Sequence, residues 1–187
     1  MEADTLERLT ALEGWFTPEE GERLGDLARS VRADHAIIEL GSYAGRSSCW
    51  MAASEPDAHI TCIDPWFPWD HPDYPEITDG GLEAFRRNVA GGGWGASITP
   101  LRSTSAEVAG MWLQPVGLVF IDTIHDLEHA MTDFADWAPH VTAGGVIAFH
   151  DDSAAFPGIG EAVRVVLAFG WEDLGLVGSL HSVGKPR

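Results

Sequence analysis

The segment 37–48, IIELGSYAGRSS, constrains the fold of this chain more than any other. Apolar residues at 36–38 precede Glu39, then come Gly41 and Gly45, and an amphipathic stretch follows. This order predicts a buried strand, a tight glycine turn and the start of a helix. Gly41 permits backbone angles that other residues avoid, and it lets a ligand approach the main chain closely.

The spacing of the two glycines, Glu-x-Gly-x-x-x-Gly, narrows the kind of ligand. A dinucleotide fingerprint requires glycines at 41, 43 and 46, but Tyr43 and Arg46 occupy two of these positions. A Walker loop requires Gly-Lys followed by Ser or Thr, and this turn lacks that sequence. The turn therefore predicts a nucleoside ligand without a pyrophosphate.

Strands and helices are expected to alternate along the whole chain. The expected strands are 36–40, 59–64, 97–101, 116–122 and 144–152, with a closing pair within 171–185. The expected helices are 4–13, 18–31, 45–54, 80–90, 126–138 and 158–169. The alternation predicts an α/β fold with a Rossmann-like, doubly wound, mostly parallel sheet of seven strands. The length of 187 residues favours a single domain, 1–187, in which 1–31 form N-terminal helices.

Local signals mark one helix start and the state of the cysteines. Thr17-Pro18-Glu19-Glu20 predicts a helix with Thr17 as N-cap, Pro18 in the first position and Glu20 completing a capping box. Cys49 and Cys62 are expected to be buried, reduced and without chemistry, because they form no Cys-x-x-Cys pair.

The formal net charge of −18 argues against several classes of partner. Nucleic-acid backbones and anionic membranes would be repelled, so a neutral or cationic small molecule fits better. The charge also serves solubility. No apolar window is long enough for a transmembrane helix. The N-terminus MEADTLERL lacks an apolar signal core, and we therefore expect a cytoplasmic protein.

Asp64 ends the second expected strand, 25 positions after Glu39. Nucleoside sites of Rossmann type place an acid near this distance, because the second strand lies beside the first. Its carboxylate can then accept hydrogen bonds from both ribose hydroxyls. An acid at the end of a strand can also be a helix N-cap, but the glycine turn at the right distance favours the ribose role.

Acids also follow the fourth and fifth expected strands. If these strands are neighbours, Asp122 converges on Asp151 and Asp152, and three adjacent carboxylates repel one another. A divalent cation such as Mg²⁺ relieves that repulsion. The alternative is structural: Asp122 and Asp126 as helix caps, Asp151 and Asp152 in a turn.

Residues 65–75 contain four prolines and four aromatic residues with no helical or strand period. Proline prevents regular hydrogen bonding here, yet leaving so many aromatic side chains in water is unfavourable. One interpretation is a lid over an acceptor pocket, spanning 65–80. The other is an irregular surface loop or a subunit contact, as in a homodimer.

The segment ELGSYAGRSS resembles motif I of the class I S-adenosylmethionine (SAM) dependent methyltransferases. Its residues are most similar to motif I of the small bacterial branch related to macrolide-sugar and other natural-product O-methyltransferases. The GGVIAFHDD turn and the final hairpin are similar as well, so the resemblance covers nearly the whole chain from Gly14 on. It implies the class I methyltransferase fold, with the glycine loop beside the methionine part of SAM and the acid at the strand end near its ammonium.

The resemblance also implies the site residues. At position 104 a threonine replaces the acid that usually precedes the serine beside the adenine, so of that pair only Ser105 carries over. The implied SAM-binding residues are Glu39, Gly41, Ser42, Tyr43, Gly45, Ser47, Ser48, Asp64, Ser105 and Asp122.

Related metal-dependent O-methyltransferases have an Asp after the fourth strand, a His three positions on and an acidic pair after the fifth strand. By that comparison, Asp122, Asp151 and Asp152 hold Mg²⁺, which chelates the acceptor hydroxyl. His125 would then remove the proton as the methyl group transfers. It could instead be a loop histidine, since the chain has 8 histidines.

The expected function is therefore a SAM-dependent O-methyltransferase for a small-molecule hydroxyl, such as a natural-product sugar or aglycone. Three alternatives remain. One is a metal-independent or N-directed methyltransferase, and another is a non-catalytic SAM-binding protein. The third is a nicotinamide dehydrogenase, which Tyr43 and Arg46 disfavour.

Overall fold

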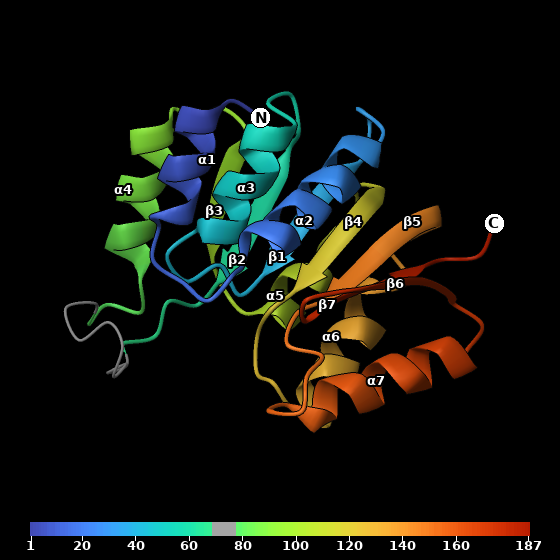
Figure 1. Ribbon diagram of the computed structural model, residues 1–187. Helices are drawn as coiled ribbons and strands as arrows, with labels where there is room; N and C mark the ends of the chain where they lie inside the picture. The colour runs from blue at the N-terminus through green and yellow to red at the C-terminus, as the bar shows by residue number, and fades with distance from the viewer. Residues whose placement is uncertain (69–77) are drawn as a thin grey trace.

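Seven strands form one sheet in the computed structural model, which describes residues 1–68 and 78–187 (Figure 1). The order across the sheet is β3-β2-β1-β4-β5-β7-β6. Strands β1 to β5 run parallel to one another, whereas β7 is antiparallel to both β5 and β6. Their bounds are β1 Ala36–Leu40, β2 Ile60–Asp64, β3 Ile98–Arg102, β4 Val116–Ile121, β5 Val141–Phe149, β6 Glu172–Val177 and β7 Leu180–Gly184. The predicted α/β fold is confirmed.

Helices cover both faces of the sheet (Figure 1). One layer contains α1 (Ala3–Thr10), α2 (Pro18–Ser30), α3 (Arg46–Ser54) and α4 (Leu82–Gly92). The other contains α5 (Ser105–Ala109), α6 (Leu127–Trp137) and α7 (Pro157–Ala168). Successive side chains of a strand point to opposite faces, so Ile37 packs in the first layer and Ile38 in the second. A strand covered on both sides must be apolar throughout, and every residue of β4 is buried.

The ends of the elements follow local chemistry. The predicted capping box at α2 is confirmed, with the Thr17 side chain accepting from Glu20 N and the Glu20 side chain accepting from Thr17 N. Asp126 caps α6, its Oδ1 accepting from His129 N at 2.8 Å. The short helix α5 was not predicted, although its capping box, formed by Thr104 and Glu107, has the Thr-x-x-Glu pattern in the sequence.

The connections around β1 position the functional site. Strand β1 lies between β2 and β4, so the chain leaves it toward one edge of the sheet and returns on its other side. At such a point the loops after the parallel strands separate and leave a crevice at the carboxyl ends. The predicted acids lie at the end of β2 and just after β4 and β5, which places them at this edge.

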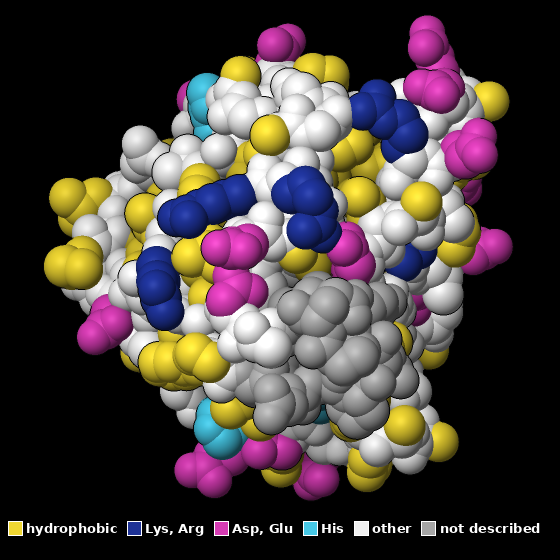
Figure 2. All heavy atoms as spheres, turned by 90° about the vertical axis from the view of Figure 1, so that its left-hand side faces the viewer, with side chains coloured by type: hydrophobic (Ala, Val, Ile, Leu, Met, Phe, Trp, Pro, Cys, Tyr) yellow, Lys and Arg dark blue, Asp and Glu magenta, His cyan; other side chains and the backbone are white. Residues whose placement is uncertain are grey.

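Charges of both signs lie on the face of the molecule drawn in Figure 2. Figure 2 shows the side on which α1 and α4 lie, where basic and acidic side chains alternate with hydrophobic ones. The ion pair between Arg87 and Glu13 links α4 to the segment that follows α1. Among the described residues, no helix is long and apolar enough to cross a membrane.

Candidate active site

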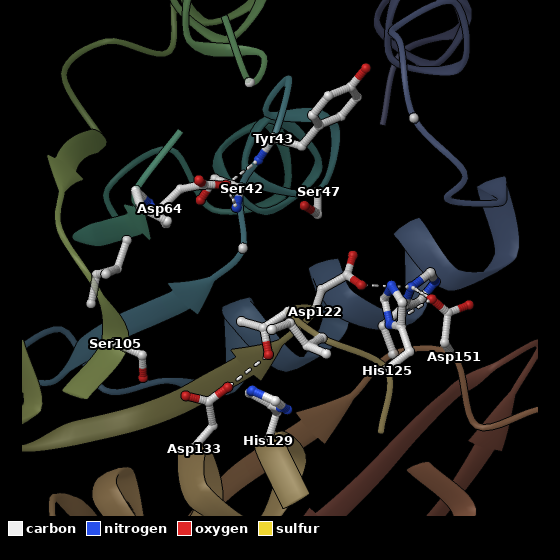
Figure 3. Close-up of a pocket in the computed structure, with 18 of the residues that line it drawn as sticks. Ser42, Tyr43, Ser47, Asp64, Ser105, Asp122, His125, His129, Asp133 and Asp151 are labelled. Atoms are coloured by element: carbon white, nitrogen blue, oxygen red, sulfur yellow. Dashed lines mark hydrogen bonds and ion pairs between the residues drawn. The ribbon is translucent and has the colours of Figure 1, made fainter. Parts of the chain in front are cut away.

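A cavity of about 640 Å³ opens at the carboxyl ends of the parallel strands (Figure 3). Residues 13–16, which connect α1 to α2, close part of it and contribute Trp15 and Phe16 to its lining. The volume suits a drug-sized ligand. Nine residues predicted for the site line this cavity: Gly41, Ser42, Tyr43, Ser47, Asp64, Ser105, Asp122, His125 and Asp151.

The glycine turn approaches the neighbouring strand too closely for a side chain. Gly41 has φ 82°, and a Cβ atom there would lie 1.9 Å from the carbonyl oxygen of Asp122. The Asp122 amide donates to the Leu40 carbonyl at 2.9 Å, which joins the ends of β1 and β4. Any larger residue at 41 would therefore separate the two strand ends that form the floor of the cavity.

Glu39 lies beneath that floor and does not line the cavity. Its carboxylate is fully buried and accepts hydrogen bonds from the hydroxyls of Ser42, Ser47 and Ser48. Burial raises the pKa of Glu39, and the three hydroxyls oppose that rise. Glu39 and Ser48, both predicted to bind the cofactor, do not line the cavity and instead support the glycine loop from below, so their role at SAM stays a prediction. Gly45, also expected at the cofactor, is the N-cap of α3 and does not line the cavity.

Asp64 lines the cavity with a carboxylate that already accepts three backbone hydrogen bonds. Its Oδ2 accepts from Ser42 N and Tyr43 N, both at 2.9 Å, and its Oδ1 accepts from Trp66 N at 2.6 Å. Burial raises the pKa of Asp64, and these hydrogen bonds counteract it. A carboxylate offers about four acceptor sites. Ribose hydroxyls at Asp64 must therefore use the remaining site or share one with the glycine loop.

Asp122, His125 and Asp151 converge at the far side of the cavity from Asp64 in Figure 3. One ligand atom of each lies within 4.8 Å of the others. His125 Nδ1 is 3.2 Å from Asp151 Oδ2. Asp152, the third predicted metal ligand, lies apart from this cluster: its Oδ2 is 2.6 Å from His181 Nδ1, and it does not line the cavity. Consecutive residues after a strand point in different directions, so only one of the acidic pair faces the cluster.

A second histidine, His150, lies directly behind the cluster and was not predicted. Its Nδ1 is 3.3 Å from Asp122 Oδ1 and 3.4 Å from Asp151 Oδ2. Its Nε2 is 3.6 Å from Glu20 Oε2. Burial alone would lower its pKa, but Asp122, Asp151 and Glu20 raise the pKa of His150 to about 12. The surrounding carboxylates therefore favour the protonated form of His150 beside the cluster.

Glu20 anchors this imidazolium from the N-terminal layer. Its carboxylate is buried and accepts from Thr17 N at 2.8 Å, Ser179 N at 2.7 Å and Ser179 Oγ at 2.8 Å. Burial raises its pKa, but the hydrogen bonds from His150, Thr17 and Ser179 outweigh this and leave the pKa well below the usual range. The sequence identified Glu20 as a helix cap, and nothing in the local pattern indicates its second role.

The predicted aromatic lid, 65–80, is described in part, since residues 69–77 lie outside the described part. Pro65, Phe67 and Gly80 line the cavity. Trp66 instead is buried in the core, where it packs against Phe85 and donates from Nε1 to Tyr43 O at 2.9 Å. This tryptophan therefore supports the glycine loop, and a lid over the cavity stays a prediction.

A family model described as a methyltransferase domain matches residues 38–151. This chain belongs to that methyltransferase family. The match covers more than half of the chain and spans the glycine turn, Asp64 and the cluster after β4 and β5. The resemblance of motif I to the class I SAM-dependent methyltransferases is thereby confirmed.

Solved structures share the fold of this methyltransferase. A structural-genomics protein from Corynebacterium glutamicum has a TM-score of 0.75 and 15% identity over 100% of this chain and 91% of that one. The O-methyltransferase TomG from Streptomyces achromogenes, involved in tomaymycin synthesis and solved with SAM, has a TM-score of 0.68 and 15% identity over 99% and 91%. An O-methyltransferase from Bacillus cereus was solved with S-adenosylhomocysteine (SAH). It has a TM-score of 0.68 and 16% identity over 99% of this chain and 92% of that one.

Proposed function

We propose that this methyltransferase transfers the methyl group of SAM to a hydroxyl of a small molecule. The observation that carries the proposal is the pair of His125 and Asp151, which lines the same cavity as the glycine turn and Asp64. Nucleoside-binding features and a candidate base thus share one cavity. TomG and the Bacillus cereus enzyme, which have the same fold, are O-methyltransferases solved with SAM and SAH.

In this proposal the glycine turn and its serines hold the methionine part of SAM. Gly41 leaves room for the ligand at the main chain, and Ser42, Tyr43 and Ser47 line the adjoining wall. Asp64 binds the ribose through its free acceptor site. The sulfonium then points its methyl group toward the cluster of Asp122, His125 and Asp151.

His125 acts as the general base, and Asp151 orients it. The Asp151 carboxylate accepts from the Nδ1–H of His125, which leaves Nε2 unprotonated and able to take a proton. As the acceptor oxygen forms its bond to the methyl carbon, the carbon–sulfur bond breaks and SAH leaves. The hydroxyl proton passes to Nε2. SAM already carries a reactive methyl group, so the protein has to align the oxygen and manage this proton.

The donor set fits a divalent cation. Asp122 and Asp151 offer carboxylate oxygens at the cavity wall, and Mg²⁺ is commonly bound by one or two carboxylates with water and substrate oxygens. A bound Mg²⁺ would polarise the acceptor hydroxyl and lower its pKa. His125 would then remain available to accept the proton of the acceptor hydroxyl.

A metal-independent reaction is the second candidate, and His150 favours it. Its Nδ1 lies 3.3 Å from Asp122 Oδ1 and 3.4 Å from Asp151 Oδ2, the two carboxylates that a cation would need. The positive charge of protonated His150 offsets part of the repulsion between Asp122 and Asp151, and that repulsion was the argument for a metal ion. The His125–Asp151 pair needs no metal to act as a base.

We propose a natural-product sugar or aglycone as the acceptor class. Trp15, Phe16 and Ile124 give the cavity an apolar wall suited to a neutral organic molecule. We further propose that residues 1–187 act as one domain, because the segment after α1 completes this wall. An amine acceptor and a purely SAM-binding role are the remaining alternatives.

The test is a calorimetric titration of the purified protein with SAM, once with Mg²⁺ and once with EDTA. Binding in at least one condition is expected, followed by a mass increase of about 14 Da of an acceptor in a screen of hydroxylated small molecules. Failure of a folded sample to bind SAM in either condition would refute the proposal. Transfer to amines but not to hydroxyls would replace it with an N-directed enzyme.

A further inference from the structure

A buried acid on α6 lines the cavity, and the proposed reaction does not use it. Asp133 is 7% exposed, and its Oδ2 accepts from the Thr123 hydroxyl at 2.7 Å. Burial raises its pKa, while hydrogen bonds from Ser105 and Thr123 favour its charged form. Two donors leave about two acceptor sites of the carboxylate open.

The side chains that line the cavity form three groups in Figure 3. The first holds the glycine loop and Asp64, and the second holds Asp122, His125 and Asp151. Ser105, Asp133 and His129 make up the third group, away from His125 and Asp151 in this view. Ser105 Oγ accepts from Trp137 Nε1 at 2.9 Å, which holds the serine in place within this third group.

The shape of SAM assigns the third group to the adenine. The sulfonium and the base are attached at opposite ends of the ribose ring. If the ribose lies at Asp64 and the methyl group faces His125, the base must extend away from the cluster, into the part of the cavity walled by Ser105 and Asp133. This step rests on the proposed function.

We propose that Asp133 recognises the exocyclic 6-amino group of the adenine and selects 6-amino over 6-oxo purines. An ionised carboxylate only accepts hydrogen bonds, and the 6-amino group only donates them. A 6-oxo purine presents an oxygen at the same position, which repels the carboxylate, and its N1–H donor lies one ring atom away from the position of the amino group. Such a mismatch at a buried polar group discriminates strongly.

The experiment measures Kd for SAH and for S-inosylhomocysteine, its 6-oxo counterpart, by calorimetry. The wild-type protein is expected to bind SAH at least about tenfold more tightly. In Asp133→Asn this ratio is expected to fall by about tenfold or more, because the amide can donate to the 6-oxo oxygen. The introduced side chain would keep the contact with Thr123, since its carbonyl oxygen can accept from that hydroxyl. Asp136→Asn, on the same helix but outside the cavity lining, is the matched control and should leave the ratio unchanged.

The two roles that Asp133 could have give different results. A residue that merely holds Thr123 would weaken both ligands equally when it is changed, and the ratio would stay constant. Equal affinity of the wild type for both ligands, or an unchanged ratio in Asp133→Asn, would overturn the inference while leaving SAM binding intact. A folded wild-type protein that binds neither ligand would refute the proposed function as well.

A measurement on the wild type alone covers the case in which Asp133→Asn does not fold. An SAH analogue whose purine has no substituent at position 6 lacks the donor but brings no repelling oxygen. Its Kd is expected to lie between those of SAH and S-inosylhomocysteine. Binding as tight as that of SAH would contradict a role of the 6-amino group.

Discussion

Nε2 of His150 lies 3.6 Å from Oε2 of Glu20, so a carboxylate at the start of α2 faces a buried imidazolium behind the cluster. The same ring reaches Asp122 and Asp151 through Nδ1. The N-terminal helical layer and the acids at the ends of β4 and β5 are therefore joined by one side chain. Glu20 also holds Ser179 between β6 and β7, which makes it a structural link among three parts of the chain.

Replacement of Glu20 by Gln should destabilise the protein by about 3 kcal/mol at pH 7, because it leaves a buried cation with less compensation. Gln can still complete the capping box, so helix capping is retained. The pKa of Glu20 is lowered in the folded state, so its contribution is present above the unfolded value of about 4.3 and is lost as the pH falls through the folded value. Urea denaturation at pH 7 and at pH 3, well below the unfolded pKa, measures the loss of this contribution. Glu19→Gln, exposed on the same helix, is the control, and an equal loss in both variants would contradict the assignment.

Replacement of His125 by Ala should lower turnover about 10²- to 10⁴-fold while leaving the affinity for SAM unchanged, as expected for loss of a general base. Steady-state kinetics with an identified acceptor, together with calorimetry, separate the two effects. His59→Ala, exposed and outside the cavity lining, serves as the control. Full activity of the His125 variant would exclude it as the base.

Metal binding should depend on Asp122 and not on Asp152. Asp122→Asn is expected to weaken Mn²⁺ binding by more than about tenfold, since it removes a charged ligand. Asp152→Asn should change it less than about twofold, because that side chain faces His181. Electron paramagnetic resonance measures the concentration of free Mn²⁺ and so gives the amount bound. Wild-type protein that binds SAM but no Mn²⁺ would support the metal-independent reaction and remove the metal from the proposal.

Replacement of Asp64 by Ala should weaken SAM binding by about 1.5–3 kcal/mol, the range for a hydrogen bond to a charged group. Part of this loss would reflect the glycine loop, because Ser42 N and Tyr43 N lose their acceptor as well. Calorimetry with SAM measures the change, and Asp57→Ala, an exposed acid just before β2, controls for charge. Unchanged affinity would disprove the ribose role.

The sequence determined the architecture, because its signals are local. The apolar strands, the Thr17 capping box and the glycine turn each act within a few residues, and the structure contains all of them. Acids at strand ends could be assigned to one edge from the sheet order alone. Motif I likewise indicated the methyltransferase family, which the match of the family model to residues 38–151 confirms.

Tertiary structure decided which of these side chains meet. Asp151 turns toward His125 while its neighbour Asp152 turns toward His181, and no pattern in the sequence separates two adjacent acids. Glu20 and Asp133 look like an ordinary cap and an ordinary helix residue until the packing brings them to His150 and to the cavity wall. The physical reason is that backbone conformation follows from neighbouring residues, whereas burial and charge pairing depend on residues far apart in the chain.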